Sequence, residues 1–350
     1  MKKSLYAVLS LMVVVLLSAF FLPERAGEQT EKKFFGALPS LFYMENETAE
    51  QKEDDGIKVD VYITQEKKIR SVPLEEYVAG VVASEMPMSY PSEALNAQAV
   101  AARSYALFKT KWYSGEGCLS HPGADVCSSP GCCQGYRPPD DDIYKNAIKA
   151  AKDTENLIVT FRNRPIRALY HACSGGHTEN AENVYSEALA YLRGVPSPGE
   201  EGHPKYGNRT KMHISELEEA FSGDENVVFL MDYPISEQME ILSVSDTGRV
   251  MDLRIGLYRI SGAEFRKKTA LDSSSFQMEF DDEAACVTFV TKGFGHGVGL
   301  SQAGAEAMAK GGKTFEQILT HYYSGVSVQN LTEIIKKEDV QRAYVPRYCL

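Results

Sequence analysis

Residues 74–87, LEEYVAGVVASEMP, decide the fold around the candidate site, because a carboxylate continues their apolar stripe. Apolar side chains recur there at helical spacing, at Leu74, Val78, Val81 and Val82. Glu85 is the next position on that face, while Pro73 can begin the helix and Pro87 ends it. A carboxyl group held among apolar side chains has a raised pKa, which suits it to donate a proton. Glu85 is therefore a candidate general acid; the alternative is a structural carboxylate that pairs with Arg103 or turns outward at a frayed helix end.

A second helix is expected to begin at residues 91–92, with Ser92 as its N-cap. Alanines at positions 99, 102 and 106 give this helix a stripe of small side chains. Such a stripe allows close packing on the neighbouring helix, which would bring Arg103 near the end that carries Glu85.

Four segments occur in a recognisable order: EMP at 85–87, QAVAARSYA at 98–106, ACSGGHTE at 172–179 and GFGHGVGLSQAGA at 293–305. Together they resemble the SpoIID family over about residues 57–325. The resemblance implies a lytic transglycosylase that cuts peptidoglycan glycan strands during engulfment of the forespore, and the family's acid residue maps onto Glu85.

Substrate contacts are expected from three further features. The Ser-Gly-Gly segment follows an expected strand and could turn sharply, with backbone N–H groups free for a ligand; the alternative is an ordinary turn. Tyr191 and Arg193 could line the same cleft, because aromatic faces can stack on sugar rings and arginine can bind sugar hydroxyls. The family pattern implies a lysine at position 193, which is not equivalent to arginine. His296 is either a site residue or a packed structural histidine. The candidate substrate residues are Arg103, Tyr105, Ser174, Gly175, Gly176, Tyr191, Arg193, His296 and Gln302.

The order of expected elements indicates an α+β fold, a single elongated mixed α/β catalytic domain with a catalytic cleft over residues 57–330. Two strands joined by a turn near Gln65 are expected over 57–72. Further strands are expected at 157–161, 166–171 and across 227–292, and helices at 143–151, 217–221, near 262–266, at 303–310 and at 315–323. Residues 114–142 read as a Cys/His-rich loop insertion, residues 196–212 as a loop and residues 331–350 as a C-terminal tail.

The N-terminus carries an apolar run without charges from Ser4 to Leu22, preceded by two lysines. Its length predicts a transmembrane anchor over residues 1–23 with the remainder outside the cell membrane, or alternatively a cleaved signal peptide. Residues 24–56 are polar and read as a flexible tether. The formal net charge of −11 argues against a nucleic-acid partner.

Seven cysteines are present, and four of them lie in the 114–142 insertion. A structural Zn²⁺ site is predicted there, and the resemblance favours it, with the ligands His121, Cys127, Cys132 and Cys133. Cys118 is the reserve ligand, because the adjacent Cys132 and Cys133 can share one ion only through a tight turn. The alternative is disulfide bonding.

The functional expectation is cleavage of MurNAc–GlcNAc bonds in peptide-free glycan, with 1,6-anhydroMurNAc products and a single catalytic glutamate. The resemblance also implies a location in the septal or engulfing membrane of the mother cell, with a cell-wall amidase and engulfment-machinery partners. The alternative is a non-catalytic amidase enhancer or cell-wall-binding module. The sequence shows no second carboxylate near Glu85, although Glu179 or Asp125 could be supplied from afar.

Overall fold

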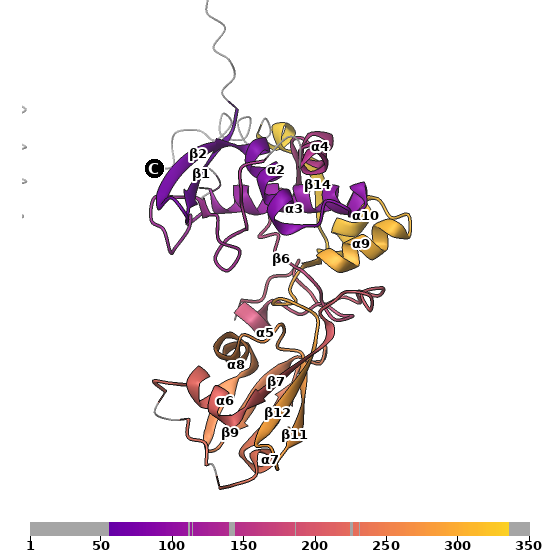
Figure 1. Cartoon of the computed structure of the whole chain (residues 1–350). Coiled ribbons are helices and arrows are strands. Elements are labelled where there is room, and N and C mark those ends of the chain that lie inside the picture. The colour runs from indigo at the N-terminus through magenta and orange to yellow at the C-terminus, as the bar shows by residue number, and fades with distance from the viewer. Residues whose placement is uncertain are drawn as a thin grey trace, which may run out of the picture. The chain divides into compact units, whose positions relative to one another are not determined.

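The computed structural model describes residues 56–335, except positions 111, 112, 114, 140–143, 186, 225, 226 and 231. The expected anchor, nearly all of the tether and Cys349 lie outside these residues. Among the described residues, no helix combines the length and apolar composition needed to cross a bilayer. The mixture of helices and small sheets confirms the α+β class (Figure 1).

The chain first forms the expected hairpin. Strand β1 (Lys58–Ile63) pairs antiparallel with β2 (Lys68–Pro73), and every second residue of β1 is buried. Strand β3 (Val126–Cys127) of the Cys/His-rich insertion adds to β1 in parallel. The insertion is therefore attached to the sheet that leads directly into the Glu85 helix.

Helix α2 (Leu74–Glu85) begins after Pro73 and ends as expected, because Met86 is extended in front of Pro87. Helix α3 (Ser92–Lys109) is capped by Pro91, so Ser92 is its first helical residue and not its N-cap. A core surrounds α3, and it includes residues of α2, of α4 (Lys145–Asp153), of β4 (Leu157–Phe161) and of α10 (Phe315–Tyr322). Figure 1 shows α2, α4 and α10 gathered around α3.

Further short helices and strands complete this part of the fold. They are β5 (Arg164–Pro165), β6 (Tyr170–His171), α5 (Glu182–Tyr185), β13 (Leu300–Ser301), α9 (Gln302–Lys310) and β14 (Ser327–Asn330). Strand β14 pairs with β4, and β13 pairs in parallel with β6. The helix that follows β14 buries Leu331 and Ile334 in the core, so the expected tail boundary at residue 331 is wrong.

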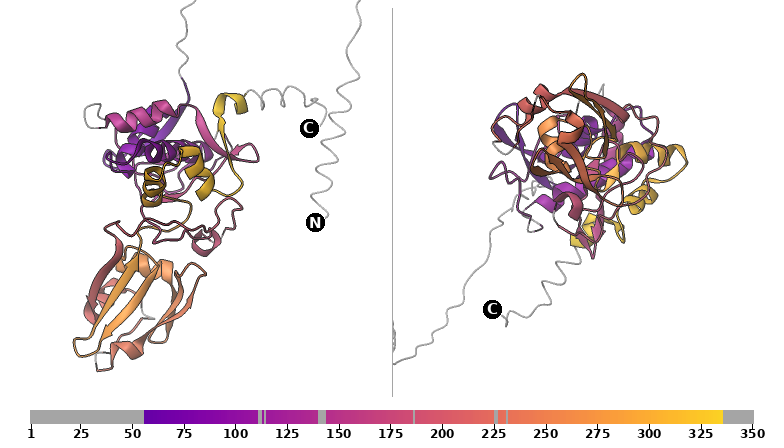
Figure 2. Two further views of the ribbon diagram at one scale, coloured as in Figure 1. Left: turned by 90° about the vertical axis from the view of Figure 1, so that its right-hand side faces the viewer. Right: turned by 90° about the horizontal axis from the view of Figure 1, so that it is seen from below.

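A second core lies in the strand-rich segment after residue 205. Strand β7 (Tyr206–His213) lies largely within 196–212, where a loop was expected. The prediction was wrong because β7 pairs with β12, which is distant in sequence. The other elements, which Figure 2 shows from two further sides, are α6 (Ile214–Ala220), α7 (Ile235–Gln238), β8 (Met239–Val244), β9 (Val250–Ile255), β10 (Tyr258–Ser261), α8 (Gly262–Thr269), β11 (Phe276–Asp281) and β12 (Cys286–Lys292). Phe265 on α8 packs on Phe221, Phe276 and Phe289 at the centre of this core.

Candidate active site

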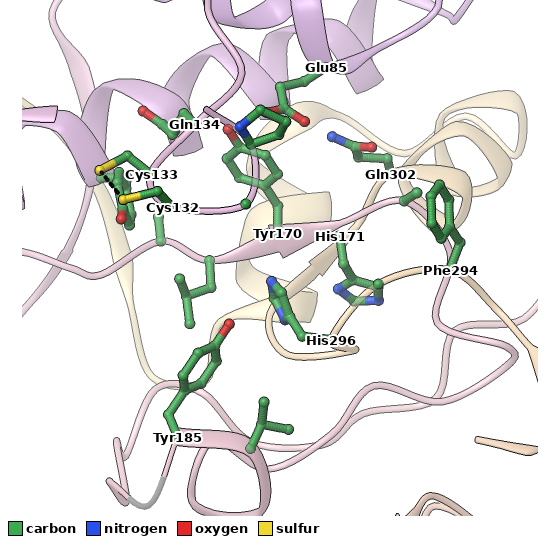
Figure 3. A pocket seen from close by; sticks show the side chains of 18 of the residues that line it. Glu85, Cys132, Cys133, Gln134, Tyr170, His171, Tyr185, Phe294, His296 and Gln302 are labelled. Atoms are coloured by element: carbon green, nitrogen blue, oxygen red, sulfur yellow. Dashed lines mark hydrogen bonds between the residues drawn. The ribbon is translucent and has the colours of Figure 1, made fainter. Parts of the chain in front are cut away.

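Glu85 opens into a cavity of about 720 Å³. Segments from across the chain line it, among them the Cys/His-rich loop, the stretch 167–172, α8 and the glycine-rich segment before α9. Of the described residues that line the cavity, Glu85 is the only carboxylate. Figure 3 shows Glu85 together with Tyr170, Gln302 and the two histidines of the cavity.

A backbone hydrogen bond fixes the Glu85 carboxyl group: the Gly135 N–H donates to Glu85 Oε1 at 2.5 Å. Gln302 lines the same cavity, and its side-chain amide donates to Gln98 Oε1 at 3.3 Å. Burial raises the pKa of Glu85 above its ordinary value, and the polar groups of Gly135 and Gln302 oppose the rise without cancelling it. The carboxyl group is thus held as the sequence predicts, at the end of a buried helix face and with a raised pKa.

Gly135 leaves no room for a larger side chain beside the present position of the Glu85 carboxylate. A Cβ atom at Gly135 would lie 2.8 Å from Glu85 Oε1 and 2.8 Å from Ser84 Oγ. Any larger residue would therefore displace the carboxylate. The sequence contains no periodic signal for this contact, since Gly135 lies in an irregular loop 50 residues from Glu85.

Aromatic and imidazole rings form much of the wall. The cavity is lined by Tyr105, Tyr170, Tyr185, Phe294, His171 and His296. Burial and the nearby Arg249 and Arg266 lower the pKa of His296 to about 3, so its imidazole is neutral at ordinary pH. The predicted candidates Tyr105, His296 and Gln302 line the same cavity as Glu85. Tyr170 and His171 line it too, although no sequence pattern singled them out as site residues. They belong to the strand expected at 166–171, of which only 170–171 is a strand.

Arg103 lies elsewhere. It is fully buried and pairs with Glu75 at the start of α2, not with Glu85 at its end. It also donates to the carbonyls of Leu157 at 3.0 Å and Ala151 at 3.1 Å. A substrate in the cavity cannot reach it, so the expected substrate role is wrong; Arg103 joins α2, α4 and β4.

The polar groups of the Ser-Gly-Gly segment are also hydrogen-bonded to another residue of the chain. The Ser174 hydroxyl and the Gly175 and Gly176 N–H groups all donate to Glu200 Oε2, at 2.8, 2.8 and 3.2 Å. The other oxygen of Glu200 accepts from Ser301 at 2.5 Å. The expectation of free N–H groups is therefore wrong: this segment anchors a buried carboxylate that also holds the N-cap of α9, next to Gln302.

The remaining predicted substrate residues do not line the main cavity. Tyr191 is buried, and its hydroxyl accepts from the Arg167 N–H at 3.2 Å. Arg193 forms an ion pair with Glu182. Both roles assigned from the sequence are therefore not supported by the positions of these side chains.

Neither of the distant carboxylates joins Glu85. Glu179 is buried and accepts hydrogen bonds from Ser245 at 2.6 Å and from Thr247. Asp125 accepts from the Asp60 N–H at 3.0 Å. The cavity therefore has one carboxylate among its described lining residues.

A candidate metal centre lies in the insertion. The ligand atoms of Cys118, His121, Cys127 and Cys132 all lie within 4.8 Å of one another. Three thiolates and an imidazole at this spacing match the donor set of a closed tetrahedral zinc site. Cys118, the reserve ligand, belongs to this group in place of the predicted Cys133. The Cys133 sulfur still lies near it, 4.0 Å from Cys132 Sγ.

The centre adjoins the cavity. Cys132 and Cys133 line it, and Gln134 and Gly135 follow directly in the chain. The Tyr77 hydroxyl of α2 donates to Gln134 Oε1 at 2.9 Å, beside the Gly135 contact to Glu85. A metal held by this loop would thus fix the segment that positions the carboxylate.

Comparison with known proteins identifies the family of this chain. Residues 62–161 match the SpoIID family model, described as Stage II sporulation protein. The chain is 31% identical to Stage II sporulation protein D of Bacillus amyloliquefaciens, over 90% of the chain and 88% of the relative. It is 30% identical to the Bacillus subtilis protein of the same name, over 89% of each, and 25% identical to the Bacillus subtilis Amidase enhancer, over 71% of the chain and 40% of that protein. Because a relative is 31% identical over 90% of the chain and 88% of its own length, the chain belongs to the SpoIID family of sporulation proteins.

Proposed function

We propose that this protein is a peptidoglycan lytic transglycosylase with Glu85 as its single catalytic carboxyl group. The observation that carries the proposal is the lone carboxyl group, with a raised pKa, in a cavity walled by aromatic rings. Aromatic faces suit sugar rings, and a raised pKa keeps a carboxylic acid protonated closer to neutral pH.

The chemistry needs only one carboxyl group. Protonated Glu85 donates its proton to the oxygen that bridges MurNAc C1 to GlcNAc, and the C1–O bond breaks. The resulting carboxylate then accepts the proton of the MurNAc 6-hydroxyl as that oxygen bonds to C1, which closes the 1,6-anhydro ring. The Gly135 N–H holds the carboxyl group in place during both steps.

The other residues serve binding and structure. A zinc ion held by Cys118, His121, Cys127 and Cys132 would cross-link the insertion; with four protein ligands, it leaves no open position for substrate. The neutral His296 and the tyrosines line the space for the glycan. We further place the protein at the engulfing membrane of the mother cell, acting on peptide-free strands beside a cell-wall amidase.

The test is product analysis with the purified protein on peptide-free glycan. Mass spectrometry should find 1,6-anhydroMurNAc ends, and Glu85→Gln should lower the rate by roughly 10²–10⁴-fold. Glu76→Gln is the matched control, because Glu76 lies on the same helix but is exposed and outside the cavity lining. A Glu85→Gln rate within about threefold of wild type would show that Glu85 is not the acid.

The same experiment separates the second candidate, which the similarity to the Amidase enhancer supports. A non-catalytic module would yield no anhydro ends alone, and it would raise the rate of an added cell-wall amidase. Anhydro ends from the protein alone would exclude it.

A further inference from the structure

The cavity that holds Glu85 is rich in positive charge, although the chain carries a formal net charge of −11. Arg167, Arg266 and Lys267 line it, against the single carboxyl group of Glu85. An uncharged glycan has no need of such a wall. The excess of cations indicates an anionic group on the ligand.

The guanidinium group of Arg266 is held in an orientation that suits binding of an anion. Its Nε donates to the carbonyls of Leu271 at 3.1 Å and Asp272 at 3.2 Å, which fixes the plane of the guanidinium group. Within the part of the chain that the structure describes, its two Nη atoms have no hydrogen-bond partner. A fixed guanidinium with free Nη atoms suits bidentate binding of a carboxylate.

The two other cations are weakly engaged. Lys267 is exposed and has no ion-pair partner among the described residues. Arg167 approaches the exposed Glu187 at 3.6 Å, a surface pair of small energetic value, and lies over the Tyr185 ring at 5.0 Å. Both side chains therefore keep charge available for a ligand.

The positive charge is associated with one side of the cavity. Arg167 and Arg266 both act electrostatically on Tyr185 and on His296. In Figure 3 the His296 and Tyr185 rings lie below Glu85. Neither cation is among the causes of the pKa shift of Glu85, which are burial and the polar groups of Gly135 and Gln302.

We propose that Arg266 and Lys267, assisted by Arg167, bind the free lactyl carboxylate of a muramic acid residue in the glycan. The proposal rests on the proposed function, since it concerns the same cavity and the same substrate. In intact peptidoglycan the lactyl carboxyl is an amide of the stem peptide and carries no charge. These cations would therefore supply the contact that favours the peptide-free strands of the proposed function.

The test compares two forms of one peptide-free glycan: one with free lactyl carboxylates, the other with these groups converted to methylamides. The wild-type protein should cleave the free acid with a kcat/KM roughly 10–150-fold higher, the range expected for charge-assisted hydrogen bonds. Arg266→Gln and Lys267→Met should each reduce this preference, and the double variant should bring it towards one. Lys268→Met is the matched control, because Lys268 lies on the same helix, pairs with Asp224 and is outside the cavity lining.

A binding measurement keeps the inference independent of catalysis. Calorimetry with Glu85→Gln should give a lower Kd for the free acid than for the methylamide, and Arg266→Gln in that background should remove the difference. Equal cleavage of both forms by the wild type, or equal binding, would overturn the carboxylate site while leaving the transglycosylase proposal intact. Preferential binding without cleavage by the wild type would support this site and contradict the proposed function.

Discussion

Replacement of Arg103 by alanine should destabilise the protein without weakening substrate binding. The side chain is fully buried, bridges to Glu75 and satisfies two carbonyl groups, at Leu157 and Ala151. Removing one partner of a buried ion pair costs about 3–5 kcal/mol. The Glu75 side chain is 32% exposed and can regain water, so the lower half of that range, about 3–4 kcal/mol, is expected.

Urea unfolding followed by circular dichroism measures this loss, and KM for peptide-free glycan is measured well below the melting temperature. Arg103→Lys is the control: it keeps the charge but loses the planar fork, so its loss should be intermediate. A double-mutant cycle with Glu75→Gln should show coupling, because the two side chains are direct partners. A loss below about 1 kcal/mol, or a tenfold rise in KM at unchanged stability, would refute the structural role.

Three further predictions concern the site. Gly135→Ala should lower activity at least tenfold with little change in melting temperature, because its Cβ would meet Glu85 Oε1 at 2.8 Å, whereas Gly131→Ala, with its nearest contact at 3.9 Å, should keep activity. The folded-state pKa of Glu85 is raised, so its contribution to stability is fully present below the unfolded pKa of about 4.3 and is lost as pH rises through the folded pKa. Glu85→Gln should therefore gain stability relative to wild type as the pH is raised from 4 to 8. A stability difference between the two proteins that stays constant across that range would contradict this. Chelation or His121→Ala should release one zinc per chain and lower the melting temperature, as elemental analysis and calorimetry would show. The metal assignment would be overturned by less than about 0.2 zinc per chain in protein purified without chelator, together with disulfides in the 118–133 loop.

Several features followed from the sequence because they depend on local periodicity. The apolar stripe of α2 placed Glu85 at the end of a buried face, and the prolines at 73 and 87 fixed the bounds of the helix. The alternation in β1 predicted the first hairpin. The Gly-rich segment before α9 gave His296 and Gln302 as candidate substrate residues, and both line the cavity.

The tertiary structure alone decided the partners of the polar groups. Arg103 lies on the helix that packs against α2, but periodicity cannot say which end of α2 it meets, and packing selects Glu75 instead of Glu85. The Ser-Gly-Gly N–H groups have a partner 25 residues away, Glu200, for which no local pattern exists. Hydrogen bonds and ion pairs between distant segments depend on how helices and sheets pack, and that geometry is set by the whole core and not by any one stretch of residues.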